Sequence, residues 1–114
     1  MAVAGNPLFW MVIGHFLADY PLQGDWLSKA KNPSLEIVPG EKIWPLALCG
    51  HALIHSGSVL FITGSPPLGF AEFAAHYLID FWKCRGGLSY NGDQYLHLLC
   101  KVVWFVASTL MVNR

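Results

Sequence analysis

Hydrophobic residues form four long runs along this chain, and short polar segments separate them. Runs of this length and composition predict helices, and proline and glycine mark where each helix begins or ends. We therefore predict an all-α protein whose four helices span Asn6–Leu27, Ile43–Thr63, Leu68–Cys84 and Asn91–Val112.

Two features interrupt this simple pattern. Pro21 falls inside the first predicted helix, and proline lacks the amide proton that a helix interior needs. A kink near residues 18–20 is therefore expected. The stretch 28–42 is polar and carries Asn32-Pro33 and Pro39-Gly40, which predicts a loop.

The composition favours a membrane environment. Of the 114 residues, 54% are hydrophobic and only 12% are charged, about half the charged share of a soluble domain. The length suffices for one domain, so we predict a single four-helix transmembrane bundle over residues 1–114. The third helix is short for a span and requires tilt or local thinning. No basic segment precedes the first apolar run, so we interpret that run as a retained helix rather than a signal peptide.

Charge sets the expected partners and the topology. Seven acidic residues balance seven lysines and arginines, so there is no basic surface for nucleic acid. Lys29, Lys31 and Lys42 lie in or beside one linker, and Lys83 and Arg85 lie at another. The positive-inside rule then predicts that both linkers are cytoplasmic and that both termini are outside. The predicted partner is the lipid bilayer, with a host membrane protein or a second copy as further possibilities.

Histidine spacing is the main functional signal. Each of the five histidines has a histidine or an aspartate four residues away, which places the two side chains on one helix face. The pairs are His15 with Asp19, His51 with His55, His76 with Asp80, and Asp93 with His97. All four pairs lie toward the basic linkers. We therefore predict that they share one cluster on the cytoplasmic side.

Imidazole and carboxylate at this spacing can bind a divalent metal ion. The set exceeds what one tetrahedral ion needs, so either two ions bind or some members orient the ligands. Zinc suits the histidine-rich set best, followed by manganese or iron. A metal open to water would hydrolyse a lipid-linked or membrane-borne substrate. The predicted ligands are His15, Asp19, His51, His55, His76, Asp80, Asp93 and His97, and the predicted catalytic residues are Asp19, Asp93, Lys83 and Gln23.

The four motifs H-F-L-A-D-Y-P-L-Q, H-A-L-I-H, H-Y-L-I-D-F-W-K and D-Q-Y-L-H-L resemble those of a family of small bacterial and phage membrane proteins, domain of unknown function 3307. The resemblance covers about residues 9–98 and implies a multi-pass protein of the bacterial inner membrane. The chain is also distantly similar to membrane-bound metal-dependent hydrolases, which implies hydrolysis without naming a substrate.

Structural interpretations remain open beside the metal hypothesis. Buried polar pairs also hold membrane helices together, so the cluster would then belong to a non-enzymatic effector. Asp80 and Lys83 share a helix face and would neutralise each other in one interpretation. A proton or metal-ion conductor is disfavoured because residues 59–63 and 105–112 carry few polar groups. Haem binding is also disfavoured, because the closest histidine pair lies on one helix.

Several other residues are expected to have ordinary roles. Five tryptophans are interpreted as interfacial anchors, four acidic residues as solvated groups, and three cysteines as buried free thiols without a disulfide. They are Trp10, Trp26, Trp44, Trp82 and Trp104; Asp25, Glu36, Glu41 and Glu72; and Cys49, Cys84 and Cys100.

Overall fold

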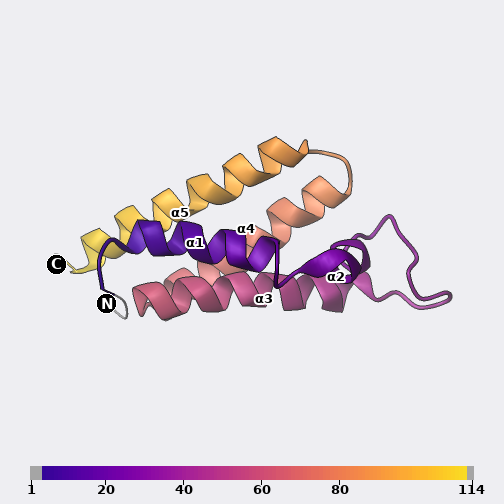
Figure 1. Cartoon of the computed structure of the whole chain (residues 1–114), viewed down its shortest axis with the longest axis horizontal. Helices are drawn as coiled ribbons and strands as arrows, with labels where there is room; N and C mark the ends of the chain where they lie inside the picture. The colour runs from indigo at the N-terminus through magenta and orange to yellow at the C-terminus, as the bar shows by residue number, and fades with distance from the viewer. Residues whose placement is uncertain (1–3, 113–114) are drawn as a thin grey trace.

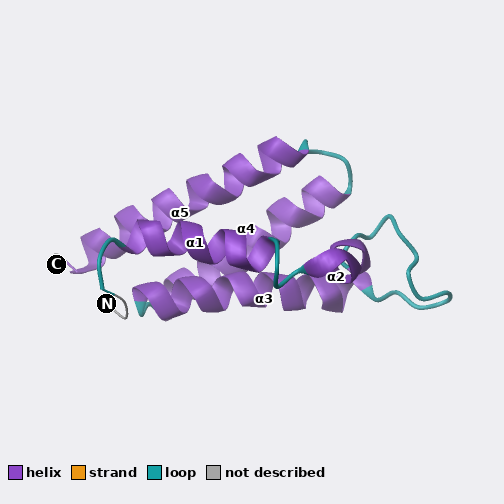
Figure 2. Cartoon of the chain, viewed as in Figure 1, coloured by secondary structure: helices purple, strands orange, loops and turns teal. Residues whose placement is uncertain are grey.

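The computed structural model describes residues 4–112, and within them the regular structure is entirely helical (Figure 2). Five helices follow one another along the chain (Figure 1). They are α1 (Pro7–Asp19), α2 (Gly24–Ala30), α3 (Trp44–Thr63), α4 (Pro66–Cys84) and α5 (Tyr90–Val112). The all-helical class is confirmed, whereas the predicted number of helices is one too small.

The difference lies at Pro21. The sequence predicted a kink within one helix, but α1 ends at Asp19 and α2 begins only at Gly24. Proline clashes with the preceding turn and offers no amide proton. The chain therefore makes a turn over residues 20–23, and Gly24 leaves it with a φ of 68°, a conformation that glycine adopts without strain.

Helix ends elsewhere follow the sequence closely. Asn6 caps α1 by accepting a hydrogen bond from the Leu8 amide at 2.9 Å, and Ser65 caps α4 through the Leu68 amide at 3.3 Å. Between α3 and α4, Gly64 adopts a φ of 70° at the C-cap. Because only Gly64 and Ser65 separate these helices, α3 and α4 form a tight hairpin.

The four long helices form an antiparallel bundle with the ring order α1, α3, α4, α5. Figure 1 shows both described ends of the chain at one end of the bundle, and the 20–43 and 85–89 connections at the other. The two basic linkers therefore lie at the same end, as the sequence predicted. Helix α2 lies beyond the end of α1 and packs against α3.

Small residues bring α3 close to both of its neighbours. A Cβ atom at Gly14 of α1 would overlap the Ser58 hydroxyl of α3. On the other side, the Ser56 hydroxyl donates to the Gly69 carbonyl of α4 at 2.6 Å. Close approach at small residues and hydroxyl hydrogen bonds are the usual contacts between helices in membranes.

The distribution of hydrophobic residues is inverted relative to a soluble domain. Among the described residues, the fully buried set contains more polar and charged side chains than hydrophobic ones. Large hydrophobic side chains instead cover the outside, with Phe61, Phe70 and Leu110 each more than 60% exposed. Soluble monomers rarely expose contiguous apolar surface on this scale.

The prediction of four membrane spans needs correction. Two helices, α3 and α5, are long and apolar enough to cross a membrane. Helix α1 has 13 residues and is about 20 Å long, short of the roughly 30 Å hydrocarbon core. Helix α4 has 19 residues, but Glu72, Asp80 and Lys83 lower its apolar character. Two candidate spans suggest a membrane protein.

A small hydrophobic core occupies the half of the bundle near the termini. It consists of Met11, Val59, Ile62 and Leu68, with Trp104, Phe105 and Ala107 packed against it. We call this region the apolar half. Apart from Ser65 and Ser108, the buried polar side chains lie in the remaining half of the bundle, which we call the polar half.

Candidate metal centre

The five histidines come together inside the bundle, although they belong to four helices. His55 and His76 stack with ring centroids 3.7 Å apart, and His76 and His97 stack at 4.0 Å. His51 lies 4.7 Å from His55, and His15 lies 5.3 Å from His55. All five rings are at most 1% exposed. The pairs that are spaced by four within each helix thus bring their histidines together into one cluster.

Four residues of this cluster form a compact group of potential metal ligands. Asp19, His51, His55 and His76 each offer one ligand atom, and these atoms lie within 4.8 Å of one another. The Asp19 Oδ1 atom is 3.2 Å from His51 Nε2 and 2.9 Å from His55 Nε2. Ligand atoms of a tetrahedral zinc site are about 3.3 Å apart, given bonds of 2.0–2.1 Å. The two Asp19 distances are near this value, and no two ligand atoms of the group are more than 4.8 Å apart.

Several ring nitrogens in this group lack hydrogen-bond partners. Both nitrogens of His51, Nδ1 of His55 and Nε2 of His76 are buried without a partner. His51 Nε2 lies close to Asp19, but the angle does not make a hydrogen bond. Since buried polar atoms are nearly always satisfied, the unpartnered nitrogens of His51 and His76 leave one lone pair on each ring free to bind a cation.

Glu72 holds His76 in its orientation. Glu72 Oε2 lies 3.1 Å from His76 Nδ1, which leaves Nε2 available to the group. Lys101 Nζ and Trp104 Nε1 both donate to Glu72 Oε1 at 2.8 Å. A carboxylate behind a histidine is the usual support of a metal-binding imidazole. Glu72 was expected to be solvated or interfacial, and its burial shows that this expectation is wrong.

Asp80 pairs with a lysine from outside the bundle core. Lys31, at the C-cap of α2, donates to Asp80 Oδ2 at 2.6 Å. The same oxygen is 3.6 Å from His51 Nε2 and 4.0 Å from His76 Nε2. Of the two interpretations of Lys83, its neutralisation of Asp80 is not observed, since Lys83 lies over the Tyr90 ring, 5.6 Å from its centroid.

The remaining predicted ligands form a second layer next to Asp19. Asp93 Oδ1 lies 3.1 Å from His97 Nε2, and His15 Nε2 lies 3.4 Å from Asp19 Oδ2. Gln94 joins the two pairs. Its Oε1 atom is 2.8 Å from His15 Nε2, and its Nε2 atom donates to Asp19 Oδ2 at 2.8 Å and to Asp93 Oδ2 at 3.4 Å. His15, Asp93 and His97 therefore lie beside the compact group rather than within it.

The group is more open on the α1 side. The Asp19 side chain is 10% exposed, whereas those of His51 and His55 are at most 1% exposed. Gln23 follows one turn later and donates to the Asp19 carbonyl at 3.1 Å, while its Oε1 atom is buried without a partner. Tyr20 and Tyr90 join α1 to α5 nearby through their hydroxyl groups.

The buried charges do not cancel within the protein. The buried residues Glu72, Asp80 and Asp93, together with Asp19, which is 10% exposed, supply four carboxylates, while Lys31 and Lys101 supply two ammonium groups. With neutral histidines the interior carries a net charge of −2. Uncompensated charge in an apolar setting is costly, and one divalent cation would neutralise it.

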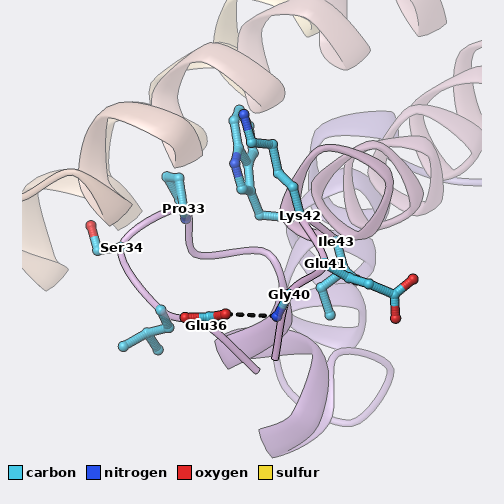
Figure 3. A pocket seen from close by; sticks show the side chains of 9 residues that line it. Pro33, Ser34, Glu36, Gly40, Glu41, Lys42 and Ile43 are labelled. Atoms are coloured by element: carbon cyan, nitrogen blue, oxygen red, sulfur yellow. Dashed lines mark hydrogen bonds between the residues drawn. The ribbon is translucent and has the colours of Figure 1, made fainter. Parts of the chain in front are cut away.

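Other polar features lie away from this centre. A pocket in the connection between α2 and α3 is lined by residues 33–36 and 40–44 (Figure 3), and Glu36 Oε1 accepts from the Gly40 amide there at 2.8 Å. It contains none of the predicted site residues. Asp25, Glu36 and Glu41 are exposed as predicted. The three cysteines are free thiols, but they are partly rather than fully buried.

Sequence reasoning missed three residues of the polar interior. Glu72 precedes His76 by four residues, so the spacing that revealed the other pairs was present there too. Lys31 lies in a polar segment, and Gln94 is a single residue with a side-chain amide that follows Asp93. No pattern in the sequence indicated that either side chain reaches the cluster.

The bundle is thus a helical protein with a buried cluster of histidines and carboxylates. The chain belongs to the family described as "Protein of unknown function (DUF3307)", whose family model matches residues 8–114. The resemblance to domain of unknown function 3307 is confirmed, while the likeness to membrane-bound hydrolases finds no support in the comparisons. Neither the curated proteins nor the solved structures contain a match to this chain.

Proposed function

We propose that this protein is a multi-pass membrane protein that binds one divalent metal ion, zinc above manganese or iron, through Asp19, His51, His55 and His76. The observation that carries the proposal is the convergence of three buried imidazoles, each with at least one unpartnered ring nitrogen, and one carboxylate within 4.8 Å. The net charge of the interior supports a divalent rather than a monovalent ion. Histidine-rich ligand sets favour zinc.

The hydrophobic side chains on the outside of the bundle support a location in the bilayer. Exposed hydrophobic side chains on all four long helices suit lipid, and the polar interior would be shielded from it. We propose the bacterial inner membrane, with the two basic linkers in the cytoplasm and both termini outside. The shorter helices α1 and α4 would then sit in a locally thinned bilayer.

For the activity, we propose hydrolysis of a lipid-linked or membrane-borne substrate. When bound, such an ion supplies Lewis-acid activation of water near neutral pH. Substrate would approach from the α1 side, where Asp19 is partly exposed. Gln23 Oε1, which has no partner, would accept a hydrogen bond from the substrate. Lys83, over the exposed Tyr90 ring, would contact an anionic group, and Asp93 would support the centre through His97.

Metal analysis of the full chain, purified in detergent, tests the binding site. We expect one zinc ion per chain after dialysis, and we expect His51→Ala and His55→Ala to lose it. His97→Ala serves as the matched control, because His97 lies outside the compact group and its variant is expected to keep the ion. Folded protein that takes up no zinc would refute the proposal.

Acyl-chain esters and phosphoesters with a chromogenic leaving group test the activity. We expect turnover by zinc-loaded protein in micelles, and loss of turnover on chelation and in His51→Ala. An Asp93→Asn variant that stays folded, keeps zinc and loses turnover would further support catalysis.

One observation favours a second candidate function. Four protein ligands with nearly complete burial are typical of structural metal sites, which leave no position for substrate. The protein would then be a non-enzymatic effector that binds a host membrane protein or a second copy, with the ion holding four helices together. Zinc binding that raises thermal stability, with no turnover on any probe, would favour this candidate.

A further inference from the structure

The two oxygens of the Asp19 carboxylate face different surroundings. Oδ1 faces the compact group, at 3.2 Å from His51 and 2.9 Å from His55. Oδ2 faces the opposite way, toward the second layer, at 2.8 Å from Gln94 Nε2 and 3.4 Å from His15 Nε2. A carboxylate with both oxygens directed at potential cation positions is suited to bridge two ions.

The amide of Gln94 occupies the space on the Oδ2 side. Its NH₂ group lies between two carboxylates, donating to Asp19 Oδ2 at 2.8 Å and to Asp93 Oδ2 at 3.4 Å. Its carbonyl oxygen lies 2.8 Å from His15 Nε2. One neutral side chain thus satisfies groups from α1 and α5 that would otherwise be free to bind a cation.

The groups around this amide form a ligand set of their own. Asp19 Oδ2 and Asp93 supply carboxylate oxygens, and His15 and His97 supply imidazoles, with His97 Nε2 3.1 Å from Asp93 Oδ1. Two carboxylates and two imidazoles are a suitable set for zinc, manganese or iron. His15 Nδ1 is buried without a partner, so this layer is not fully satisfied by its present contacts.

Charge explains why the protein would keep this second position closed. One divalent ion balances the net charge of −2 that four carboxylates and two lysines leave in the interior. A second divalent ion would create an excess of two positive charges in an apolar setting, at a large cost. A neutral amide in that position satisfies both carboxylates and adds no charge.

We propose that Asp19, Asp93, His15 and His97 outline a second cation position, and that the Gln94 amide fills it and limits the centre to one ion. The inference rests on the proposed function, since it requires an ion in the group of Asp19, His51, His55 and His76. It identifies Gln94 as the residue that decides how many metal ions this bundle holds.

Substitution of Gln94 by glutamate tests the proposal with little change in shape. In Gln94→Glu, three carboxylates would meet where two carboxylates now share an amide, and their repulsion would be relieved by a cation. We expect the wild-type chain to bind one zinc ion and Gln94→Glu to bind two, measured as metal per chain after zinc titration and dialysis. Asn91→Asp is the matched control. It adds the same charge at an exposed position in the first turn of α5, so one ion is expected.

The outcomes separate this inference from the function it rests on. Folded wild-type protein without zinc would refute the proposed metal centre itself. One ion in the wild type and still one in Gln94→Glu would overturn only the second position, and two ions in the wild type would overturn the role of Gln94. If Gln94→Glu does not fold, anomalous scattering from zinc-soaked wild-type crystals decides: one peak at the compact group is expected, and a second peak beside Gln94 contradicts the proposal.

Discussion

The two halves of this bundle are built from the same four helices but are held together by opposite kinds of contact. In the apolar half, Met11, Val59, Ile62 and Leu68 pack against one another without polar partners. In the polar half, histidines, carboxylates and lysines fill the interior through specific hydrogen bonds and ion pairs. The stability of the apolar half depends on how fully its side chains fill the interior, whereas that of the polar half depends on the balance of buried charges. Different substitutions should therefore destabilise the two halves.

The largest effect is expected from removing one charge of a buried ion pair in the polar half. Lys101→Met would leave Glu72 buried without its cation, and breaking such a pair costs about 3–5 kcal/mol of unfolding free energy. Denaturation in detergent micelles measures the loss. The double variant Glu72→Leu/Lys101→Met should recover much of it, because no isolated charge remains. A double variant less stable than Lys101→Met would contradict the charge-balance explanation.

A cavity in the apolar half should destabilise the protein without affecting the proposed metal centre. Met11 is fully buried, and Met11→Ala is expected to cost about 2–5 kcal/mol. The zinc content of the folded fraction should stay at one ion per chain. If Met11→Ala lost zinc while still folded, the two halves would not be separable in the way described.

Loss of the contact between Glu72 and His76 should lower the metal affinity more than the stability of the fold. Glu72→Asp keeps the negative charge beside Lys101 but shortens the side chain, so the carboxylate withdraws from His76 Nδ1. Loss of such a supporting carboxylate typically weakens metal binding about 10–100-fold, and competition with a zinc chelator would measure it. Glu41→Asp, at an exposed acid, is the control. Unchanged affinity in Glu72→Asp would show that Glu72 only balances Lys101.

The smallest effect on stability is expected at Lys29, and Lys31 nearby gives a direct contrast. Lys29 pairs with Asp25 at 3.0 Å, but the two side chains are 56% and 81% exposed. Lys29→Ala should therefore change stability by less than about 1 kcal/mol. Lys31→Ala, two residues further, should cost several times more because Asp80 is buried. Equal losses from both substitutions would mean that Lys31 contributes no more than a surface charge.

Much of the polar half could be predicted from the sequence because its residues repeat at helical spacing. Positions four apart share a helix face, so the pairs at residues 15 and 19, 51 and 55, 76 and 80, and 93 and 97 each had to present two polar groups together. Their common position along antiparallel helices then placed the four pairs at one depth. The structure brings them into one cluster, and whether that cluster binds metal stays a prediction.

The rest could not be predicted, for identifiable physical reasons. Lys31 reaches Asp80 only because the chain turns after Pro21 and directs α2 against α3, an arrangement that depends on tertiary packing. Gln94 is an isolated amide without periodic partners, so its bridging role depends on where α1 and α5 meet. Glu72 carried the right spacing to His76, and it was misjudged because acids were expected to seek solvent.

The tight connection between α3 and α4 has a consequence for how the chain enters a membrane. Helix α3 is long and apolar enough to cross a membrane, whereas α4, with Glu72, Asp80 and Lys83, is not among the candidate spans. Since only Gly64 and Ser65 separate them, α3 and α4 would enter a membrane as one hairpin, with His76 and Asp80 facing the histidines of α3. Glu72 faces α5 instead, so its carboxylate would stay without its cation until α5 is synthesised and Lys101 completes the charge balance of the interior.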